Sequence, residues 1–352
     1  MGKLDNILEE AKMPQITIIG LGLIGGSLGM ALRQAYNGKA ELVGYDSNSK
    51  AHNSAKKAGI VDRTEWNLDK AVENADVVVL AVPVGATPEI FKAIGPYLKE
   101  GATITDTAST KREVLGWANE ILPESVGFVG GHPLAGSGLS GSDAATPSLF
   151  TNKKFAVISS AKAPQSSVGQ VLKIVDDIGS SPFFLSADEH DSFVAAVAHL
   201  PAVISTALVS AIAKSPSWRE MGKFASDEFG DMSRLAGVDP EVNHGLCRTN
   251  PDMIVYWINQ MISELQDWRS MIVDENRNSS ESPLMNSFIN AWEARARWSA
   301  GIDPVDFPQQ EIPTAGDSMM SMLLGGHMAS RLSSMTKDDG QDSTRYRGRR
   351  RN

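Results

Sequence analysis

Residues 16–28 read ITIIGLGLIGGSL, an apolar β-branched run that passes directly into a G-x-G-x-x-G pattern. A dinucleotide-binding βαβ unit requires this order of strand, glycine-rich turn and helix. Gly20 allows the tight turn, Gly22 lets a pyrophosphate approach the backbone, and Gly25 lets the helix pack closely on the strand. The segment therefore predicts a Rossmann-type nucleotide site near the start of the chain.

The rest of the predicted cofactor site comes from the helix start and from two strand ends. Leu23 and Ile24 open the helix, where free N–H groups and the helix dipole favour phosphate. Asp46 ends the next strand about 20 residues after the last glycine, where a carboxylate binds the ribose hydroxyls. Val82 and Pro83 close a continuous apolar strand and are expected beside the cofactor. A carboxylate repels the 2′-phosphate of NADP, so NAD is the predicted cofactor. The serines after Asp46 keep NADP possible, and the alternative role of Asp46 is a helix cap.

Composition places the chain among soluble globular proteins. Its 352 residues suggest two domains, its hydrophobic content of 42% is ordinary, and its net charge of −9 disfavours nucleic acid as a partner. The single cysteine, Cys247, excludes an internal disulfide and fits a reducing compartment. No apolar run is expected to reach the length of a membrane span, and the first residues lack a signal-peptide core. We therefore expect a cytoplasmic protein with no membrane, nucleic-acid or metal partner.

The pattern along the chain predicts three regions. Strands alternate with helices over residues 14–182, which predicts an α/β domain with a parallel-type sheet whose strand ends gather at one edge. Residues 183–300 follow a helical pattern, and apolar residues at helical spacing over 253–268 indicate core or dimer packing. The excess of apolar surface in this all-helical domain predicts a homodimer. Residues 301–352 are expected to form a partly disordered extension, in which a methionine-rich segment suits a short docking helix.

Two polar segments follow predicted strands and carry candidate chemistry. In DTASTK (106–111) the Ser109 hydroxyl offers a donor and an acceptor beside the nicotinamide, and the alternative is a helix cap by Ser109 or Thr110. In GGHPLAGS (130–137) the imidazole of His132 has a pKa suited to accepting a proton from a hydroxyl while hydride leaves the same carbon. The alternative is a histidine that only satisfies backbone groups of the loop.

A third segment lies in the helical region and holds an isolated cation. Arg234 stands among small and apolar residues in FGDMSRLA (229–236). A guanidinium in such surroundings needs an anionic partner, because an unpaired buried charge is costly. A substrate carboxylate suits its planar fork, and Asp231 of the same chain is the alternative partner.

Together these motifs resemble those of prephenate dehydrogenases and their arogenate-using relatives. The elements GLGLIGGS, DTAST-K, GGHPLAGS, EHD…HLP and DMSR follow in the same order over about residues 14–275. Reductases of the 3-hydroxyisobutyrate type share only the first element and use a lysine in place of the histidine. The resemblance implies an enzyme of tyrosine biosynthesis with a helical dimerisation domain. It implies oxidative decarboxylation of prephenate to 4-hydroxyphenylpyruvate, in which hydride passes from ring C4 to NAD and CO2 is lost.

The resemblance also implies roles for individual residues. His132 is expected to bond the C4 hydroxyl as a catalytic residue, and Ser109 to orient His132 or the same hydroxyl. Arg234 is expected to bind a substrate carboxylate. His199 is a further substrate-binding candidate, with helix packing as its alternative. His190 is expected to serve the helix start rather than the chemistry.

Two departures from the family pattern leave the substrate open. Many prephenate-specific members carry a second histidine after His-Leu-Pro, where this chain has Ala202, and Gly138-Leu139-Ser140 stands where Glu-Lys-Ser is common. Arogenate therefore remains an alternative or additional substrate. The residues after 300 are too few for a regulatory ACT domain. Two other hypotheses remain: a β-hydroxyacid-type oxidoreductase that uses a lysine such as Lys111, and a non-catalytic NAD-binding scaffold.

Overall fold

The computed structural model describes residues 13–136, 141–160, 162–275 and 282–301. By its contacts the chain divides into one unit up to residue 261 and a second from residue 262, and each is described by itself. The predicted division after residue 182 stays a prediction. The triplet 138–140 and residues 302–352, which include the methionine-rich segment, lie outside the described residues.

One mixed sheet forms the centre of the first unit. Among the described residues eight strands pair in the order β3-β2-β1-β4-β5-β6-β7-β8. Their bounds are β1 (Gln15–Ile19), β2 (Glu41–Tyr45), β3 (Arg63–Thr64), β4 (Val77–Leu80), β5 (Thr103–Asp106), β6 (Gly127–Pro133), β7 (Lys154–Ser159) and β8 (Ser181–Phe184). Strands β1 to β6 pair in parallel, which confirms the predicted α/β class with a parallel-type sheet.

The last two strands correct the expected direction of the sheet. We expected the segment that forms β7 to continue the parallel pattern, but β7 runs antiparallel to β6, and β8 runs parallel to β7. A parallel return needs a long crossover, usually an α-helix. The described part of the β6–β7 connection contains only the short 3-10 helix η3 (Ser142–Ala144), so the chain turns back on itself.

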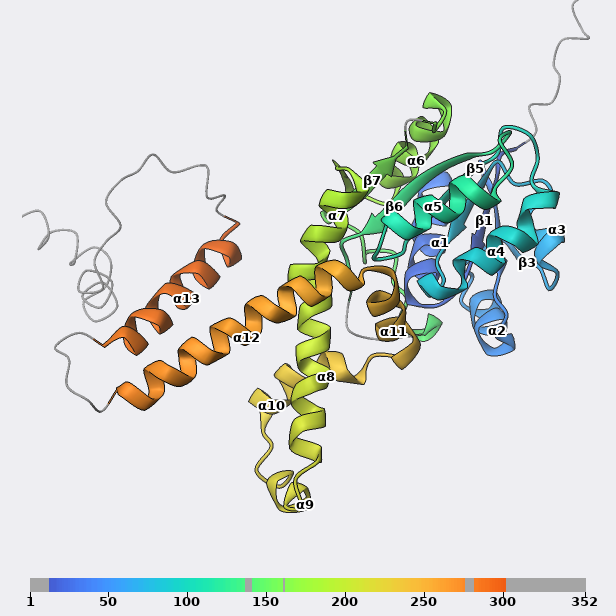
Figure 1. Cartoon of the computed structure of the whole chain (residues 1–352). Coiled ribbons are helices and arrows are strands. Elements are labelled where there is room, and N and C mark those ends of the chain that lie inside the picture. The colour runs from blue at the N-terminus through green and yellow to red at the C-terminus, as the bar shows by residue number, and fades with distance from the viewer. Residues whose placement is uncertain (1–12, 137–140, 161, 276–281, 302–352) are drawn as a thin grey trace, which may run out of the picture. The chain divides into compact units, whose positions relative to one another are not determined.

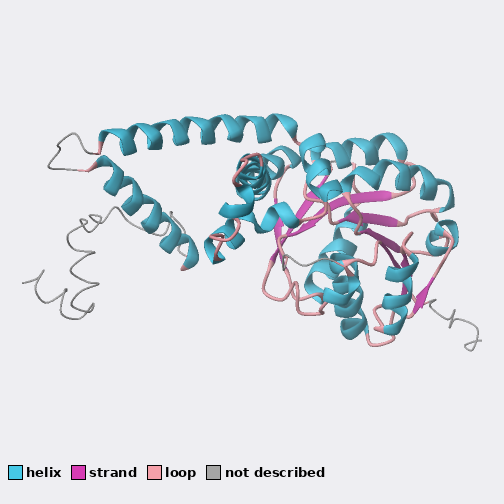
Figure 2. Cartoon of the chain, turned by 90° about the horizontal axis from the view of Figure 1, so that it is seen from below, coloured by secondary structure: helices cyan, strands magenta, loops and turns pink. Residues whose placement is uncertain are grey.

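Helices cover both faces of this sheet (Figures 1 and 2). They are α1 (Leu23–Tyr36), α2 (Ser49–Lys57), α3 (Leu68–Val72), α4 (Thr87–Ile94), α5 (Arg112–Ile121) and α6 (Gln165–Asp177), with the 3-10 turns η1 (Val84–Ala86) and η2 (Gly95–Tyr97). Alternate strand residues supply a core on each face: Ile18 packs in one cluster with Leu28, and Ile19 in the other with Leu80. The sheet is therefore buried on both sides, as its continuous apolar strands require.

The helical region begins with one long run. Its parts are α7 (Ala187–Val194), the π-helical turn η4 (Ala195–His199) and α8 (Leu200–Ala213). Ser186 and Glu189 form the capping box that their spacing predicts. The run 187–213 is long and apolar enough to cross a membrane by length and composition, so the expectation that no such run exists is wrong. One such helix is weak evidence of a membrane span, because core helices of soluble proteins pass the same test.

Within the helical pattern of residues 183–300, the sequence predicts one helix over about 218–235. This segment divides into shorter elements, and a further helix that has no separate prediction follows it. The elements are α9 (Trp218–Met221), α10 (Asp227–Ser233), η5 (Arg234–Gly237), α11 (Pro240–Thr249), α12 (Pro251–Asp274) and α13 (Pro283–Ser299). In α12 only Ile254 is buried, so the apolar face predicted there does not pack into the core of this chain.

Candidate active site

The carboxyl ends of the parallel strands gather at one edge of the sheet and border a cavity. Backbone bonds tie neighbouring ends together: Gly20 N–H donates to the Tyr45 carbonyl at 2.8 Å. The cavity has a volume of about 770 Å³. Among the predicted cofactor residues it is lined by Gly20, Gly22, Asp46, Val82 and Pro83. The structure thus brings these five residues together.

The glycine-rich turn has the close contacts that its pattern predicts. Gly20 has a φ of 93°, and a Cβ there would overlap the carbonyl of Ala81. A Cβ on Gly25 would overlap the Gly20 carbonyl, so α1 can approach β1 only with glycine at this position. Leu23 and Gly25 lie in the first turn of α1 with Ile24, and they do not line the cavity themselves.

Asp46 holds the turn as well as facing the cavity. Its Oδ2 accepts from the Leu21 N–H at 2.7 Å, and its Oδ1 accepts from the Asn48 N–H at 2.8 Å. Asn48 is the residue that caps α2, because its side chain accepts from the Lys50 N–H. Asp46 therefore does not have the helix-cap role that was its alternative.

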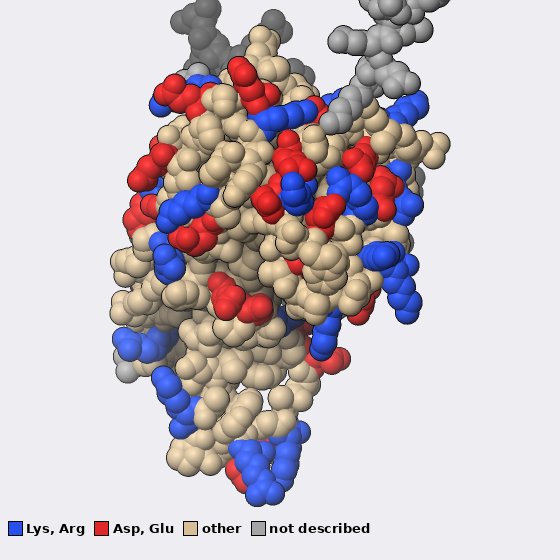
Figure 3. Space-filling model, turned by 90° about the vertical axis from the view of Figure 1, so that its right-hand side faces the viewer, with Lys and Arg blue, Asp and Glu red and all other residues tan. Residues whose placement is uncertain are grey.

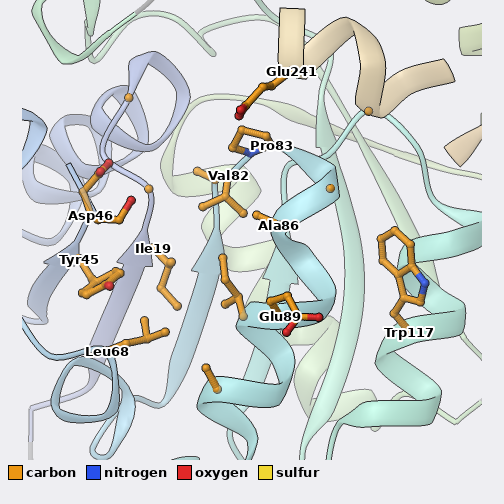
Figure 4. A pocket seen from close by; sticks show the side chains of 18 of the residues that line it. Ile19, Tyr45, Asp46, Leu68, Val82, Pro83, Ala86, Glu89, Trp117 and Glu241 are labelled. Carbon is orange, nitrogen blue, oxygen red and sulfur yellow. The ribbon is translucent and has the colours of Figure 1, made fainter. Parts of the chain in front are cut away.

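Helix α11 closes the cavity from the helical region, and sequence reasoning missed it. Glu241, His244 and Arg248 line the same space as the glycine turn. Glu241 points toward Pro83 and Val82 (Figure 4). An Asp-Pro pair signals the start of α11, but no local pattern reveals that this helix lies over the nucleotide cleft. On the face drawn in Figure 3, acidic and basic side chains intermix without forming an extended field of one sign.

Three side chains form a hydrogen-bonded chain at the end of β6. Nδ1 of His132 lies 2.9 Å from Nε2 of His190, and Nδ1 of His190 lies 2.7 Å from Oδ1 of Asp191. His190 and Asp191 are buried, whereas His132 is partly exposed. His190 bonds Asp191 near the helix start, and its ring also bonds the candidate catalytic histidine, a contact that was not expected.

This chain of bonds determines which nitrogen of His132 carries a proton. An ionised carboxylate only accepts hydrogen bonds, so Nδ1 of His190 donates to Asp191 and its Nε2 accepts from His132. His132 then carries its proton on Nδ1 and presents a lone pair on Nε2. Among the described residues no partner occupies this Nε2. The arrangement suits a general base.

The local electrostatics keep this base neutral. Burial lowers the pKa of His132 well below 6.5, and electrostatic interactions with His190, Lys111 and His199 lower it further. Burial raises the pKa of Asp191, but bonds from His190 and from the backbone N–H groups of Arg112 and Lys111 outweigh it, so the net pKa is lowered. The three-residue chain is therefore an ionised carboxylate that orients two imidazoles.

Asp191 also caps α5, a role for which Ser109 or Thr110 was the alternative expectation. It accepts from the N–H groups of Lys111 at 2.8 Å and Arg112 at 2.9 Å. Thr110 instead bonds the hydroxyl of Thr249 at 2.8 Å. The cap alternative for DTASTK is thus wrong, and the α5 cap is part of the candidate active site.

Arg112 links the nucleotide part to the helical part beside this cap. Its guanidinium donates to Oδ2 of Asp252 at 2.8 Å and to Oδ1 of Asn250 at 2.8 Å. Asn250 in turn donates to the Asp191 carbonyl at 2.7 Å. These bonds hold the start of α12 against α5.

The other predicted site residues lie in different surroundings. Ser109 is partly buried, and its hydroxyl has no hydrogen-bond partner among the described residues. His199 is buried, its Nδ1 lies 3.5 Å from Nδ2 of Asn250, and burial lowers its pKa to about 4. Arg234 is exposed on η5, which packs on α8, and among the described residues no hydrogen bond or ion pair joins it to His132 or to Asp231. The structure brings His132, Ser109 and His199 to one region but does not bring Arg234 into contact with them.

Comparison with known proteins identifies both halves of the chain. Residues 28–182 match the family model described as prephenate dehydrogenase, nucleotide-binding domain, and residues 186–286 match prephenate dehydrogenase, dimerization domain. The prephenate dehydrogenase of Lactococcus lactis is 32% identical over 258 residues, which cover 72% of this chain and 70% of that protein.

Two solved structures are similar over most of the chain. The crystal structure of prephenate dehydrogenase from A. aeolicus in complex with hydroxyphenyl propionate and NAD+ has a TM-score of 0.74 at 28% identity, covering 81% of this chain and 98% of that one. Synechocystis arogenate dehydrogenase has a TM-score of 0.65 at 25% identity, covering 81% and 99%.

Proposed function

The chain belongs to the prephenate dehydrogenase family, and from that premise we propose that it converts prephenate to 4-hydroxyphenylpyruvate by NAD-dependent oxidative decarboxylation. The observation that carries the proposal is the bonded chain from Asp191 through His190 to His132. It presents a neutral imidazole, whose Nε2 has no partner among the described residues, at the sheet edge that borders the nucleotide cavity. A base of this kind is what oxidation of a ring alcohol requires.

His132 is the proposed catalytic base. Its Nε2 accepts the proton of the C4 hydroxyl while the hydride leaves the same carbon. Positive charge then develops on the His132 ring, and the ionised Asp191 stabilises it through His190. Loss of the ring carboxyl as CO2 makes the product aromatic, so the protein needs only to position and polarise the substrate.

The cavity at the strand ends fits a dinucleotide. Gly22 faces open space where a Cβ would otherwise stand, and the first turn of α1, with Leu23 and Ile24, offers its N–H groups to phosphate. Asp46 would bind the hydroxyls of the adenosine ribose. Val82 and Pro83 would lie beside the other ribose and the nicotinamide ring. NAD, when bound there, accepts the hydride from the substrate. The carboxylate of Asp46 disfavours the extra phosphate of NADP, which remains the alternative cofactor.

Ser109, His199 and Arg234 are the proposed substrate residues. The hydroxyl of Ser109, which has no hydrogen-bond partner in the described part of the chain, suits a bond to the substrate hydroxyl or to His132. The buried, neutral His199 suits contact with the substrate side chain. Arg234, exposed and without a partner among the described residues, suits a substrate carboxylate. Lys111 is fully buried and paired with Asp106, which disfavours the rival hypothesis of a lysine that contacts substrate.

Arogenate is the second candidate substrate, favoured by one feature. Ala202 lines a mainly apolar cavity of about 430 Å³ beside His199, where many prephenate-specific relatives carry a histidine. The missing imidazole leaves room in this cavity for a different side chain. The similarity to Synechocystis arogenate dehydrogenase supports the same alternative.

We also propose a cytoplasmic homodimer formed through the helical region. The match to a dimerization domain supports it. So do the large apolar side chains that α12 exposes, which are Val255, Tyr256, Ile262, Leu265, Ile272 and Val273. We propose no nucleic-acid or membrane partner.

The test measures formation of NADH by the purified chain with prephenate and, separately, with arogenate. We expect turnover with at least one of them, and the ratio of their kcat/KM values decides the substrate. The His132→Asn variant should lose about 10²- to 10⁴-fold in kcat with unchanged NAD binding. The matched variant His52→Asn, at a buried histidine that bonds the Glu65 carbonyl, should keep its activity. No turnover with either substrate would contradict the proposed function.

A further inference from the structure

A buried lysine lies beneath the candidate base and takes no part in the reaction as described. Lys111 has 0% side-chain exposure, and its Nζ pairs with Oδ2 of Asp106, which is also buried. Burial lowers the pKa of Lys111, and the Asp106 carboxylate opposes this. Buried ion pairs contribute little net stability, because desolvation offsets their attraction. Stability alone therefore does not explain the presence of this pair.

The pair holds the strand that carries His132. The second oxygen of Asp106, Oδ1, accepts from the Gly131 N–H at 3.0 Å. The side chain of Lys111 lies against Gly130, where an added Cβ would stand 3.0 Å from its Cδ. Asp106 thus contacts Gly131 and Lys111 contacts Gly130, the two residues that directly precede His132.

The backbone of Lys111 also bonds Asp191, the carboxylate at the far end of the hydrogen-bonded chain from His132. The Lys111 N–H donates to Oδ1 of Asp191 at 2.8 Å. The same oxygen lies 2.7 Å from Nδ1 of His190, whose Nε2 bonds the ring of His132. Lys111 therefore joins Asp106, which bonds the backbone of Gly131 just before His132, to Asp191, which bonds the His190 ring that contacts His132.

We propose that Lys111 is a positioning residue for His132: its ammonium neutralises Asp106, so that this carboxylate holds the His132 strand without an uncompensated negative charge beneath the base. This rests on the proposed function, in which His132 is the base. Lys111 touches neither substrate nor cofactor, since its side chain is wholly enclosed.

The consequence for His132 follows from the titratable and charged groups that surround its ring. These are His190 and Asp191 on α7, His199 on η4, and the Asp106–Lys111 pair beneath β6. Without the ammonium, the Asp106 carboxylate stands alone and stabilises a protonated His132. A protonated imidazole cannot accept the substrate proton.

The experiment compares Lys111→Met with the double variant Asp106→Asn/Lys111→Met. In the single variant we expect kcat to fall about 10- to 100-fold and the acid limb of kcat/KM to move up by about one pH unit. The double variant removes both charges, while its amide oxygen still accepts from Gly131. Its acid limb should return to that of the wild type, with most of kcat restored. Lys173→Met, an exposed lysine on α6, is the control and should match the wild type.

The pH profile separates positioning from a merely structural role. A folded Lys111→Met protein with the wild-type acid limb would overturn the proposal. A double variant whose acid limb moves up as much as that of the Lys111→Met variant would overturn it too. If Lys111→Met does not fold, the double variant decides alone: a wild-type limb supports the proposal and a raised limb overturns it. NMR titration of the His132 ring measures the same pKa without turnover. It therefore tests Lys111 even if neither substrate is oxidised and the proposed function fails.

Discussion

Replacing Asp191 by asparagine should break the candidate site while leaving its shape nearly intact. The two oxygens of Asp191 accept from the Lys111 N–H, the Arg112 N–H and Nδ1 of His190. An amide has one oxygen, so either the Arg112 N–H or the His190 nitrogen then faces an NH2 group. A buried donor left without an acceptor costs about 1–3 kcal/mol. If the NH2 faces His190, that ring changes tautomer, and Nε2 of His132 gains the proton that it should accept.

Two measurements test this reasoning on the Asp191→Asn variant. We expect kcat/KM for NADH formation to fall about 10²- to 10⁴-fold, the usual contribution of a general base. Thermal melting followed by circular dichroism should show a Tm lower by about 2–4 °C per kcal/mol lost. Asp188→Asn, an exposed carboxylate on the same helix, should change neither quantity. A folded Asp191→Asn protein with undiminished kcat/KM would refute the role of the bonded chain.

Three further outcomes are expected. The pKa of His199 is about 4 in the folded chain and about 6.5 in the unfolded chain, so the unfolded chain binds a proton first as the pH falls. The free energy of unfolding should therefore fall by about 3 kcal/mol between pH 6.5 and 4. Urea titrations at several pH values measure this, and a His199→Gln variant with the same dependence of unfolding free energy on pH would contradict it. Gly25→Ala should lower Tm because its Cβ meets the Gly20 carbonyl, whereas Gly22→Ala should keep Tm and weaken NAD binding in calorimetry; equal Tm losses would contradict the contrast. Asp46→Asn should raise kcat/KM with NADP relative to NAD about fivefold, from about 1 kcal/mol of removed charge repulsion, and an unchanged ratio would show that Asp46 does not select the cofactor.

The local features of the fold could be predicted because each follows from a short pattern with a physical cause. The glycine turn needs Gly20 and Gly25 wherever a strand passes tightly into a helix. The capping box at Ser186 is also local. The direction of β7 was beyond such reasoning, since it depends on how the chain returns from β6 rather than on the residues of the strand.

Only part of the candidate site could be predicted from the sequence, because some of its contacts join segments far apart in the chain. His132 stands near the end of a strand in a distinctive motif, so its place at the sheet edge could be inferred. Its bond to His190 joins residues 58 positions apart, and nothing local to either signals the contact. The same holds for α11, whose Glu241 reaches the nucleotide cavity from far along the chain. Contacts between distant segments arise from packing, which a single sequence does not display.

The π-helical turn between α7 and α8 gives one helix two independent faces. Such a turn holds one more residue than an α-helical turn does, so it shifts all that follows by about 100° around the axis. His190 and Asp191 precede the shift, whereas Ala202 follows it. Removing the exposed Val197 would leave the first two where they are and rotate Ala202 away from its cavity. A single-residue insertion or deletion at this point is thus a route by which the wall of the proposed substrate cavity can change while the bonded chain of His132, His190 and Asp191 stays fixed.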